Sequence, residues 1–471
     1  MIKLALHAQS GDGVTFAPCR FTLLVACLGT FFGIDFGFII ANQQHLIEVY
    51  ILQERDIQVI VGSYLLGALL GVFLGGLIVY SSGRKVCMLG GAALGLAGVL
   101  AASLAPNFSL LLISQVAVGF ACAVYLLAAS LYVNEIAPIS VRGLCVSAIW
   151  VSMAAGAFAA TLYRGIKPLD GGAAALAVLG LAVLLATVLG FFYLPESPRW
   201  LAFSGYPDAA LSTLFKLRRD MGSAARELAA IHESCAAEDS GMEFFLQSSN
   251  YRRTIWLLMS VSVLLHGCGF IFVPYAILDL LEAGSRSADL FASHEDSGVM
   301  QALMGSMLLA ALWSALGSDR FGRTRCLRYS LMLSVIMLLA LCGAATFAPI
   351  YLSSSMLLGI ILVYTLGTAS AFCLLVPLLA NEILPMRGRE FGCSVMLFVN
   401  AALVLAGFRV YAQIIDALGY AGYFLLCLLS LMGLMYVVVR FVPETAGIAL
   451  EVVQGRLLGG MPLRELGQPR R

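Results

Sequence analysis

The amino-acid sequence predicts an all-α membrane protein with twelve transmembrane helices. Its 471 residues are 61% hydrophobic and only 12% charged, and a soluble fold could not cover that much apolar surface. The hydrocarbon core of a bilayer, ~30 Å thick, requires roughly 20 apolar residues per helix, and twelve such runs follow one another, six on either side of a long polar stretch. The expected spans are about 21–42, 58–80, 86–105, 109–132, 144–163, 173–194, 255–281, 298–317, 327–347, 350–380, 391–415 and 420–442.

The polar stretch at residues 195–254 divides the chain. We expect a first six-helix bundle within residues 1–194, a second within 255–442 and a tail at 443–471. Two segments of the polar stretch carry apolar residues at helical spacing, and Pro207-Asp208 is typical of a helix start. The sequence therefore predicts a cytosolic linker that contains short amphipathic helices.

The distribution of Lys and Arg predicts that both chain termini are cytosolic. In this orientation only Arg55, Arg164, Lys167 and Arg286 lie outside, Arg409 lies within a span, and the rest of the 28 basic residues lie inside. Such an excess of basic residues on the inner side is the rule for membrane proteins. We expect the plasma membrane rather than an internal membrane.

Three phrases occur once in each half of the chain. They recur at separations of 247, 239 and 248 residues, so a six-helix unit has been duplicated in parallel. Duplication of this kind predicts two bundles related by a pseudo-twofold axis, with a binding site near the midplane between them. The phrases are "NEIAPISVRG" at 134–143 and "NEILPMRGRE" at 381–390, "SSGRKVCML" at 81–89 and "RFGRTRCLR" at 320–328, and "LPESPRW" at 194–200 and "VPETAG" at 442–447.

The repeated phrases place charged side chains at the cytosolic ends of spans in both halves. These charges can form a network that holds the inner side shut and breaks when it opens. As exposed pairs, each would contribute only ~0–1 kcal/mol, which suits a latch. The alternative is that they are ordinary positive-inside anchors, but the matched Glu and Arg spacing favours the network. The predicted gate residues are Arg84, Lys85, Glu135 and Arg142 in the first half and Asp319, Arg320, Arg323, Glu382 and Arg389 in the second.

The phrases "LPESPRWL", "VPETAGIALE" and "DRFGR", with the paired "NEI" phrases, together resemble the sugar porter family of the major facilitator superfamily. The resemblance covers nearly the whole chain and implies the major facilitator fold, alternating access and movement of a hexose, pentose or polyol. One inner motif departs from the family pattern, because Tyr80 and Ser81 replace an acidic or amide residue and an arginine. The second copy, residues 319–323, is intact, so we expect the second half to hold the gate.

The resemblance also implies substrate-contacting positions, most of which carry other residues here. Trp150 and His266 stand where the family uses glutamines, Asn400 retains an asparagine and Tyr275 retains a gating aromatic residue. Because an unpaired buried polar group costs roughly 1–3 kcal/mol, the lost amides would weaken hexose binding. The expected function is transport of a sugar or sugar-like solute. The alternatives are transport of a less polar or ionic solute, and a non-transporting membrane sensor or receptor on the same fold.

Asp35 lies about two-thirds of the way across the first span. An acidic residue at such depth costs ~2.5–3.5 kcal/mol on insertion scales and is a functional candidate. By resemblance it stands where proton-coupled sugar porters carry their proton acceptor, but Gln115 replaces the arginine that usually faces it. His266 lies at a matching depth, so one hypothesis is an Asp35/His266 coupling pair. The alternative is a protonated Asp35 bonded to Gln115, with His266 as a hydrogen-bonded core residue.

The sequence gives no indication of an enzyme. It contains no Walker A phrase, nucleophile–base set or metal-ligand spacing, and its twelve cysteines fall mostly within apolar runs. A net charge of +1 without a basic patch argues against nucleic acid as a partner. We therefore expect a monomeric secondary transporter without cofactor or metal, whose partners are a small solute, membrane lipid and, as a candidate, a co-transported proton.

Overall fold

The computed structural model describes residues 17–41, 43–165, 182, 185–187, 189–190, 192–235, 241–274, 276, 297–347 and 354–467. Within these residues every regular element is helical, and ten helices are long and apolar enough to cross a membrane. One of them, α19 (Arg389–Phe441), has 53 residues, or ~80 Å at 1.5 Å per residue. It is long enough for two spans and turns at Gly419, whose φ of 66° and ψ of 176° are not helical.

The first bundle is built on α6, which α4 and α5 both contact along its length, while α2 packs against α7. The contact between α4 and α6 is close, because a Cβ on Gly67 would lie 2.0 Å from the Val116 carbonyl oxygen. The span expected at 173–194 lies mostly outside the described residues. The described helices are α2 (Ala17–Ala41), α3 (Gln43–Tyr50), α4 (Glu54–Ser82), α5 (Arg84–Ser103), α6 (Phe108–Ile136) and α7 (Arg142–Gly165).

The second bundle contains two interrupted helices. After α13, Gly269 adopts a φ of 75°, and the Tyr364 hydroxyl donates to the Cys268 carbonyl that the interruption leaves free. A π-helical segment at Leu374–Leu379 contains Pro377, which has no N–H to donate. The helices before α19 are α13 (Ser249–Gly267), α15 (Ser297–Phe321), α16 (Arg323–Phe347), α17 (Ser354–Cys373) and α18 (Ala380–Ile383).

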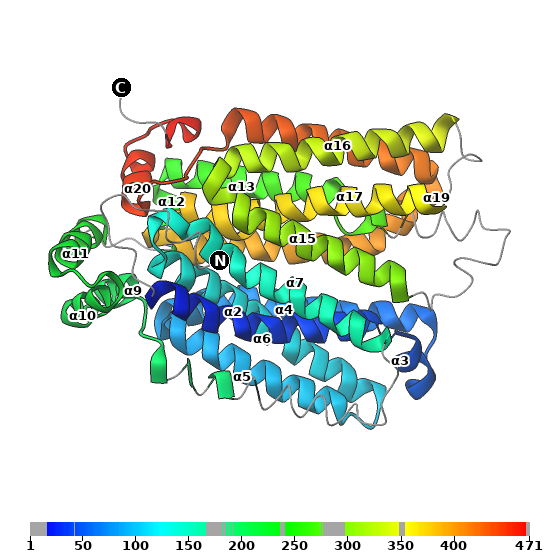
Figure 1. Ribbon diagram of the computed structural model, residues 1–471, viewed down its shortest axis with the longest axis horizontal. Coiled ribbons are helices and arrows are strands. Elements are labelled where there is room, and N and C mark those ends of the chain that lie inside the picture. The colour runs from blue at the N-terminus through cyan, green and yellow to red at the C-terminus, as the bar shows by residue number, and fades with distance from the viewer. Residues whose placement is uncertain are drawn as a thin grey trace.

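The two bundles lie side by side with their helices running in the same general direction (Figure 1). The main contacts between them are α7 against α15 and α4 against α19. In the first contact, the fifth span of the first six-helix unit meets the second span of the second unit. In the other contact, the second span of the first unit meets the fifth span of the second unit. This reciprocal pairing is what a pseudo-twofold axis between the bundles requires, so the major facilitator fold expected from the sequence is the fold of the chain.

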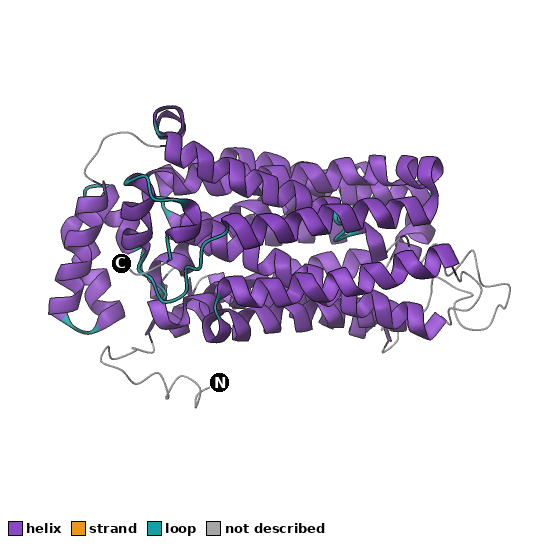
Figure 2. Ribbon diagram, turned by 90° about the horizontal axis from the view of Figure 1, so that it is seen from above, coloured by secondary structure: helices purple, strands orange, loops and turns teal. Residues whose placement is uncertain are grey.

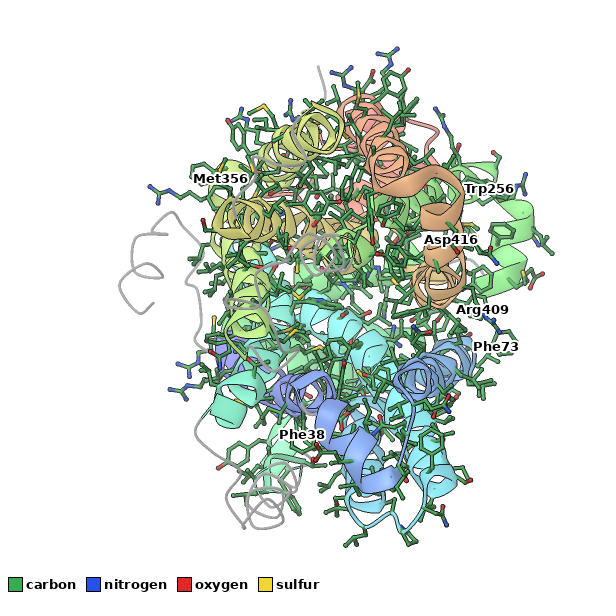
Figure 3. The ribbon with its side chains drawn as sticks, turned by 90° about the vertical axis from the view of Figure 1, so that its right-hand side faces the viewer. Phe38, Phe73, Trp256, Met356, Arg409 and Asp416 are labelled. Atoms are coloured by element: carbon green, nitrogen blue, oxygen red, sulfur yellow. The ribbon has the colours of Figure 1, made fainter. Side chains whose placement is uncertain are left out.

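Short helices gather at one end of the bundles, which we call the linker end (Figures 1 and 2). They are α9 (Pro198–Phe203), α10 (Pro207–Arg218), α11 (Met221–Cys235), α12 (Gly241–Gln247) and α20 (Leu450–Leu458). Leu214 of α10 is buried with Ala224 and Ile231 of α11, so these amphipathic helices pack on each other. At the opposite end, viewed in Figure 3, Arg409 lies exposed on α19, where a long side chain can reach the headgroup region.

Candidate functional site

Arg84, at the start of α5, is the centre of a buried charge cluster at the linker end. Its Nη2 lies 3.2 Å from Glu135 Oε1 and also contacts Glu390 Oε1 of the other bundle. The side chains of Arg84 and Glu135 are 4% and 1% exposed. The Ser197 hydroxyl donates to the second carboxylate oxygen of Glu135. Helix α6 supplies the acid here, α5 the base and the segment before α9 the hydroxyl group.

The second bundle repeats this cluster around Arg323, at the start of α16. Its Nη2 lies 3.1 Å from Glu382 Oε1, its Nε 3.3 Å from Glu382 Oε2, and its Nη1 2.8 Å from Asp319 Oδ1. The Thr445 hydroxyl donates to Glu382. Acid, base and hydroxyl therefore occupy equivalent places in the two halves of the duplicated chain.

A further glutamate in each half accepts hydrogen bonds from a helix N-terminus. Glu196 accepts from the N–H groups of Arg84 and Lys85 at 3.1 and 3.2 Å, and Glu444 accepts from those of Arg323 and Thr324 at 2.9 and 3.0 Å. Negative charge is stabilised at this end of a helix. Burial raises the pKa of Glu196, and its backbone hydrogen bonds act in the opposite direction.

Several contacts cross from one bundle to the other at the linker end. They join Arg142 Nη1 to Glu382 Oε1 (3.8 Å) and to the Ile448 carbonyl (3.1 Å), the N–H groups of Gly143 and Leu144 to Asp319 (3.0 and 2.7 Å), and the Asn134 amide to the Asn381 carbonyl (3.1 Å). Together with the Arg84–Glu390 contact, these interactions hold the bundles together at this end.

The structure differs from the sequence-based expectation for the gate in three respects. The pairs are buried rather than exposed, because each bundle covers the charges of the other. The first half takes a larger part in the gate than expected, since Glu390 gives Arg84 a cross-bundle partner. Arg320 is exposed, with its guanidinium 5.7 Å above the ring of Phe321, and has no ion pair among the described residues. Lys85 takes part through its backbone N–H.

Arg389, the counterpart of Arg142, is fully enclosed. It is 1% exposed, and its Nε donates to the Leu384 carbonyl at 3.1 Å. Its Nη1 has no hydrogen-bond partner in the described part of the chain. Six of the nine predicted gate residues are therefore buried at the linker end, whereas Lys85 and Asp319 are partly buried and Arg320 is exposed.

Sequence reasoning missed several gate residues. Arg199 donates to the Glu135 carbonyl, and its Nη2 lies 2.6 Å from Glu451 of α20. Burial by itself would raise the pKa of Glu451, but the Arg199 guanidinium outweighs this effect and holds that pKa at about 2. Glu196 and Glu444 could have been found, because both stand in the repeated Pro-Glu phrases.

A small void lies between the bundles, on the linker-end side of their middle. Its volume is about 10 Å³, room for about one water molecule, so a sugar does not fit there in this conformation. Trp150 packs edge-on against Phe372 at 5.3 Å, and Phe372 stacks on Phe270 at 5.3 Å. The lining includes Leu126, Ser130, Trp150, Pro377, Asn381 and Met396.

Two of the predicted substrate residues meet at Ser262. Asn400 Nδ2 donates to the Ser262 hydroxyl at 3.1 Å and to the Met396 carbonyl at 2.7 Å. His266 Nδ1 lies 2.9 Å from the Ser262 carbonyl. The Asn400 Oδ1 is buried without a hydrogen-bond partner among the described residues, as is the Trp150 Nε1. Tyr275 lies outside the described residues.

Asp35 lies apart from His266, in the first bundle. Its Oδ2 and the Oε1 of Gln115 are both buried without a hydrogen-bond partner in the described ranges. The side chains of Tyr64 and Cys122 lie near the Asp35 carboxyl group. No described hydrogen bond or ion pair joins Asp35 to Gln115 or to His266, so matching depth in the membrane does not bring the hypothetical pair together here.

Comparison with known proteins gives matches over nearly the whole chain. The family model described as "Sugar (and other) transporter" matches residues 21–456. The chain is 28% identical over 468 residues to the galactose-proton symporter of Escherichia coli (strain K12), covering 98% of both chains. It is 27% identical over 458 residues to the arabinose-proton symporter of the same strain, covering 95% of this chain and 94% of that protein.

Among solved structures, the proton:xylose symporter XylE bound to 6-bromo-6-deoxy-D-glucose is similar with a TM-score of 0.77 and 20% sequence identity. The alignment covers 92% of this chain and 98% of that one. At this level of identity, the likeness concerns the fold. It covers both bundles, which is where the charge clusters and the midplane residues lie.

Proposed function

The chain belongs to the sugar porter family of the major facilitator superfamily, and from this premise we propose that it is a proton-coupled symporter of a monosaccharide. Membership makes it a multi-pass secondary transporter, not an enzyme. The galactose-proton and arabinose-proton symporters among its relatives support both the solute class and the coupled ion. As an alternating-access transporter, it must expose a midplane site to one side of the membrane at a time.

One observation supports the binding site: four predicted residues each keep a buried polar atom that has no hydrogen-bond partner among the described residues. These atoms are Asp35 Oδ2, Gln115 Oε1, Trp150 Nε1 and Asn400 Oδ1. Buried polar atoms are almost always hydrogen-bonded, so each exception calls for a physical reason. A sugar hydroxyl both donates and accepts, so it can donate to Asn400 Oδ1 and accept from Trp150 Nε1. His266 adds a titratable group beside Asn400 through their shared contact with Ser262.

Asp35 is the proposed proton site. A carboxyl group inside a membrane-spanning helix, without a described cationic partner, is a place where a proton can be taken up and released. Gln115, unlike the arginine of the family pattern, cannot supply a compensating charge. Asp35 lies on α2, which packs along α7. A change of charge on Asp35 can therefore act on α7, the helix that carries Trp150 and packs against α15 of the other bundle.

The proposed gate is the set of buried charges at the linker end. We assign this end, with both termini, to the cytosol of a plasma membrane, so this conformation is closed towards the cell interior. The proposed units are the bundles within 1–194 and 255–442, the linker at 195–254 and the tail at 443–471. The proposed site and gate both lie within one chain, which is compatible with a monomer.

A second candidate is a solute with fewer hydroxyl groups. Leu126, Pro377 and Met396 in the lining of the void offer apolar contacts in place of hydrogen bonds. Such a lining favours a deoxy sugar or another less polar molecule over a fully hydroxylated hexose, since each unpaired hydroxyl would cost roughly 1–3 kcal/mol.

Transport by purified protein in liposomes tests both candidates. The labelled solutes are D-galactose, L-arabinose, D-xylose, a deoxy sugar, a polyol and an organic ion, each with and without a pH gradient. We expect at least one monosaccharide to accumulate when the interior is alkaline, and to exchange without a gradient. Flux of the organic ion alone, or no flux in correctly folded protein, would contradict the proposal.

Replacement of Asp35 by Asn tests the coupling. We expect accumulation driven by the pH gradient to fall at least roughly ten-fold, because the variant cannot bind and release the proton, while sugar exchange without a gradient persists. Asp56→Asn is the matched control, because Asp56 accepts from the Gln53 N–H at the exposed start of α4. Full gradient-driven accumulation by the Asp35 variant would remove this residue from the mechanism.

A further inference from the structure

The two copies of the gate differ in where one carboxylate is attached. The 239-residue separation that pairs Arg84 with Arg323 pairs Tyr80 with Asp319, and the 247-residue separation that pairs Arg142 with Arg389 pairs Gly143 with Glu390. The second half therefore has its acid at the end of one helix, whereas the first half has a tyrosine there. Glu390 instead supplies an acid at the start of α19, which packs against α4, the helix that carries Tyr80.

In the complete copy, Asp319 joins two elements. Its Oδ1 is 2.8 Å from Arg323 of the same bundle, and the carboxylate accepts hydrogen bonds from the Gly143 and Leu144 N–H groups of the other bundle. A negative charge at the N-terminus of α7 is favourable. The carboxylate thus lies between an arginine and the first turn of a facing helix.

Tyr80 cannot take this role in the other copy. Its side chain is 41% exposed and packs edge-on against Phe203 at 5.6 Å, and its carbonyl accepts a hydrogen bond from Trp200 Nε1 at 2.9 Å. The facing first turn is that of α19, and the second residue of that turn is Glu390. This side chain is 10% exposed and contacts Arg84 Nη2.

We propose that Glu390 replaces the acid missing at Tyr80, so that a gate carboxylate has moved from one bundle to the other while keeping its place between the arginine and the facing helix. Both copies then retain one carboxylate between an arginine and the start of the fifth span of the opposite six-helix unit. Glu390 positions Arg84 and closes the gate from the second bundle.

The relocation changes what must break when the gate opens. In the complete copy, the Asp319–Arg323 ion pair lies within one bundle and survives separation, so only its backbone contacts break. In the altered copy, the ion pair itself joins the bundles. Separating a buried pair leaves a poorly compensated charge, which is costly. The Arg84–Glu390 pair therefore stabilises the closed state, even though the first inner motif has lost its own acid at Tyr80.

Hydrogen exchange measured by mass spectrometry on the full-length protein tests this role. Peptides at the starts of α7 and α19 report opening of the linker end. We expect Glu390→Gln to speed exchange at the start of α19 at least roughly ten-fold, because Arg84 loses a buried partner. Asp319→Asn is the matched variant of the complete copy and should speed exchange at the start of α7.

A second change tests relocation directly. In the Glu390→Gln protein, Tyr80→Asp restores an acid at the original position, where it can pair with Arg84 and accept from the first turn of α19. We expect exchange to return towards the parent rate in this double variant. Tyr80→Asn in the same background removes the same ring without adding charge and should not restore it.

The inference rests on the proposed function only in requiring that the linker end opens. If Glu390→Gln exchanges like the parent while Asp319→Asn opens, or if Tyr80→Asn rescues as well as Tyr80→Asp, the role of Glu390 is wrong even for an active symporter. If Glu390→Gln is too unstable to purify, recovery of folded protein by Tyr80→Asp but not by Tyr80→Asn supports it, and equal recovery overturns it. If the exchange pattern is as expected but no sugar is transported, the role of Glu390 in the gate stands and the proposed solute is wrong.

Discussion

The two gate arginines occupy equivalent positions in the duplicated chain but are bonded very differently. All three guanidinium nitrogens of Arg323 have partners, two of them on Glu382. Arg84 bonds Glu135 and Glu390 through Nη2, whereas its Nε and Nη1 are buried without a partner among the described residues. One site of the pair is therefore saturated and the other is not.

The origin of the supporting acids explains this difference. The Arg323 cluster takes Asp319 from its own half of the chain. Two supporting acids of the first cluster come from the other half of the chain. Glu390 contacts Arg84. Glu451 pairs with Arg199, which donates to the Glu135 carbonyl. An arginine that finds both its acids within its own bundle stabilises that bundle, and one that takes an acid from the second bundle responds to their separation. The two arginines therefore differ in how far they depend on closure, although Glu382 also meets Arg142 across the bundles at 3.8 Å.

The largest expected effect comes from removing the saturated arginine. Arg323→Ala leaves Glu382 and Asp319 buried without their cation, which should cost about 3–5 kcal/mol of stability. Arg84→Ala also leaves two buried acids without their cation but should lie at the lower end of this range, about 3 kcal/mol, because fewer hydrogen bonds are lost and two unpaired nitrogens are removed. Thermal unfolding in detergent measures both.

Arg320→Ala is the control for this comparison, since Arg320 is exposed beside the same helix junction. Its effect should stay within about 0.5 kcal/mol. If Arg84→Ala lowers stability as much as Arg323→Ala does, the contrast between a saturated and an unsaturated copy is wrong.

The repeated phrases of the sequence contained most of this gate. Their places at the cytosolic helix ends predicted that Arg84 would cluster with Glu135 and Arg323 with Glu382, and each pair does form an ion pair. Spacing could not predict burial, which depends on how one bundle covers the other. Nor could it identify Glu390 as a partner of Arg84, because this acid ends the second NEI phrase and stands on a helix that meets Arg84 only in the folded chain.

The midplane was less predictable for a different reason. Hydropathy fixes how deep a residue lies in a span, and the depths of Asp35 and His266 match. Depth does not fix the direction in which a side chain points around its helix. Asp35 lies near Tyr64 and Cys122, while His266 faces Ser262, so the hypothetical pair is not formed in this conformation.

The hydroxyl groups of the two clusters offer a smaller test of the comparison. Ser197 bonds Glu135, and Thr445 bonds Glu382. Hydrogen bonds to charged groups contribute about 1.5–3 kcal/mol. We expect Ser197→Gly to lower the melting temperature more than Thr445→Val does, because the unsaturated cluster has fewer other bonds to hold its carboxylate.

Glycine is used at position 197 because it remains acceptable as an N-cap, and Ser197 also caps α9 by accepting from the Trp200 N–H. Valine at 445 keeps the shape of threonine. A larger loss at Thr445 would indicate that saturation makes a cluster more sensitive to each bond, which is the reverse of our interpretation.

The smallest expected effect is a pH dependence confined to the first cluster. Glu451 has its pKa lowered from an ordinary value of 4.5 to about 2, because the Arg199 guanidinium outweighs the effect of burial. A lowered pKa means that the folded protein favours the charged form, so this stabilisation is complete above about pH 4.5 and is lost as the pH falls towards 2. The second cluster has Gly447 where the first has Arg199, and so it lacks this ion pair.

We expect Glu451→Gln to lower stability by about 1–3 kcal/mol at pH 7. The difference in stability from the parent should narrow steadily in melting curves recorded at decreasing pH. Subtracting the variant from the parent cancels the contribution of carboxylates that lie far from Arg199. A difference that stays constant down to the lowest accessible pH would mean that Glu451 acts by packing alone, and the first cluster would then depend on the second half for Glu390 only.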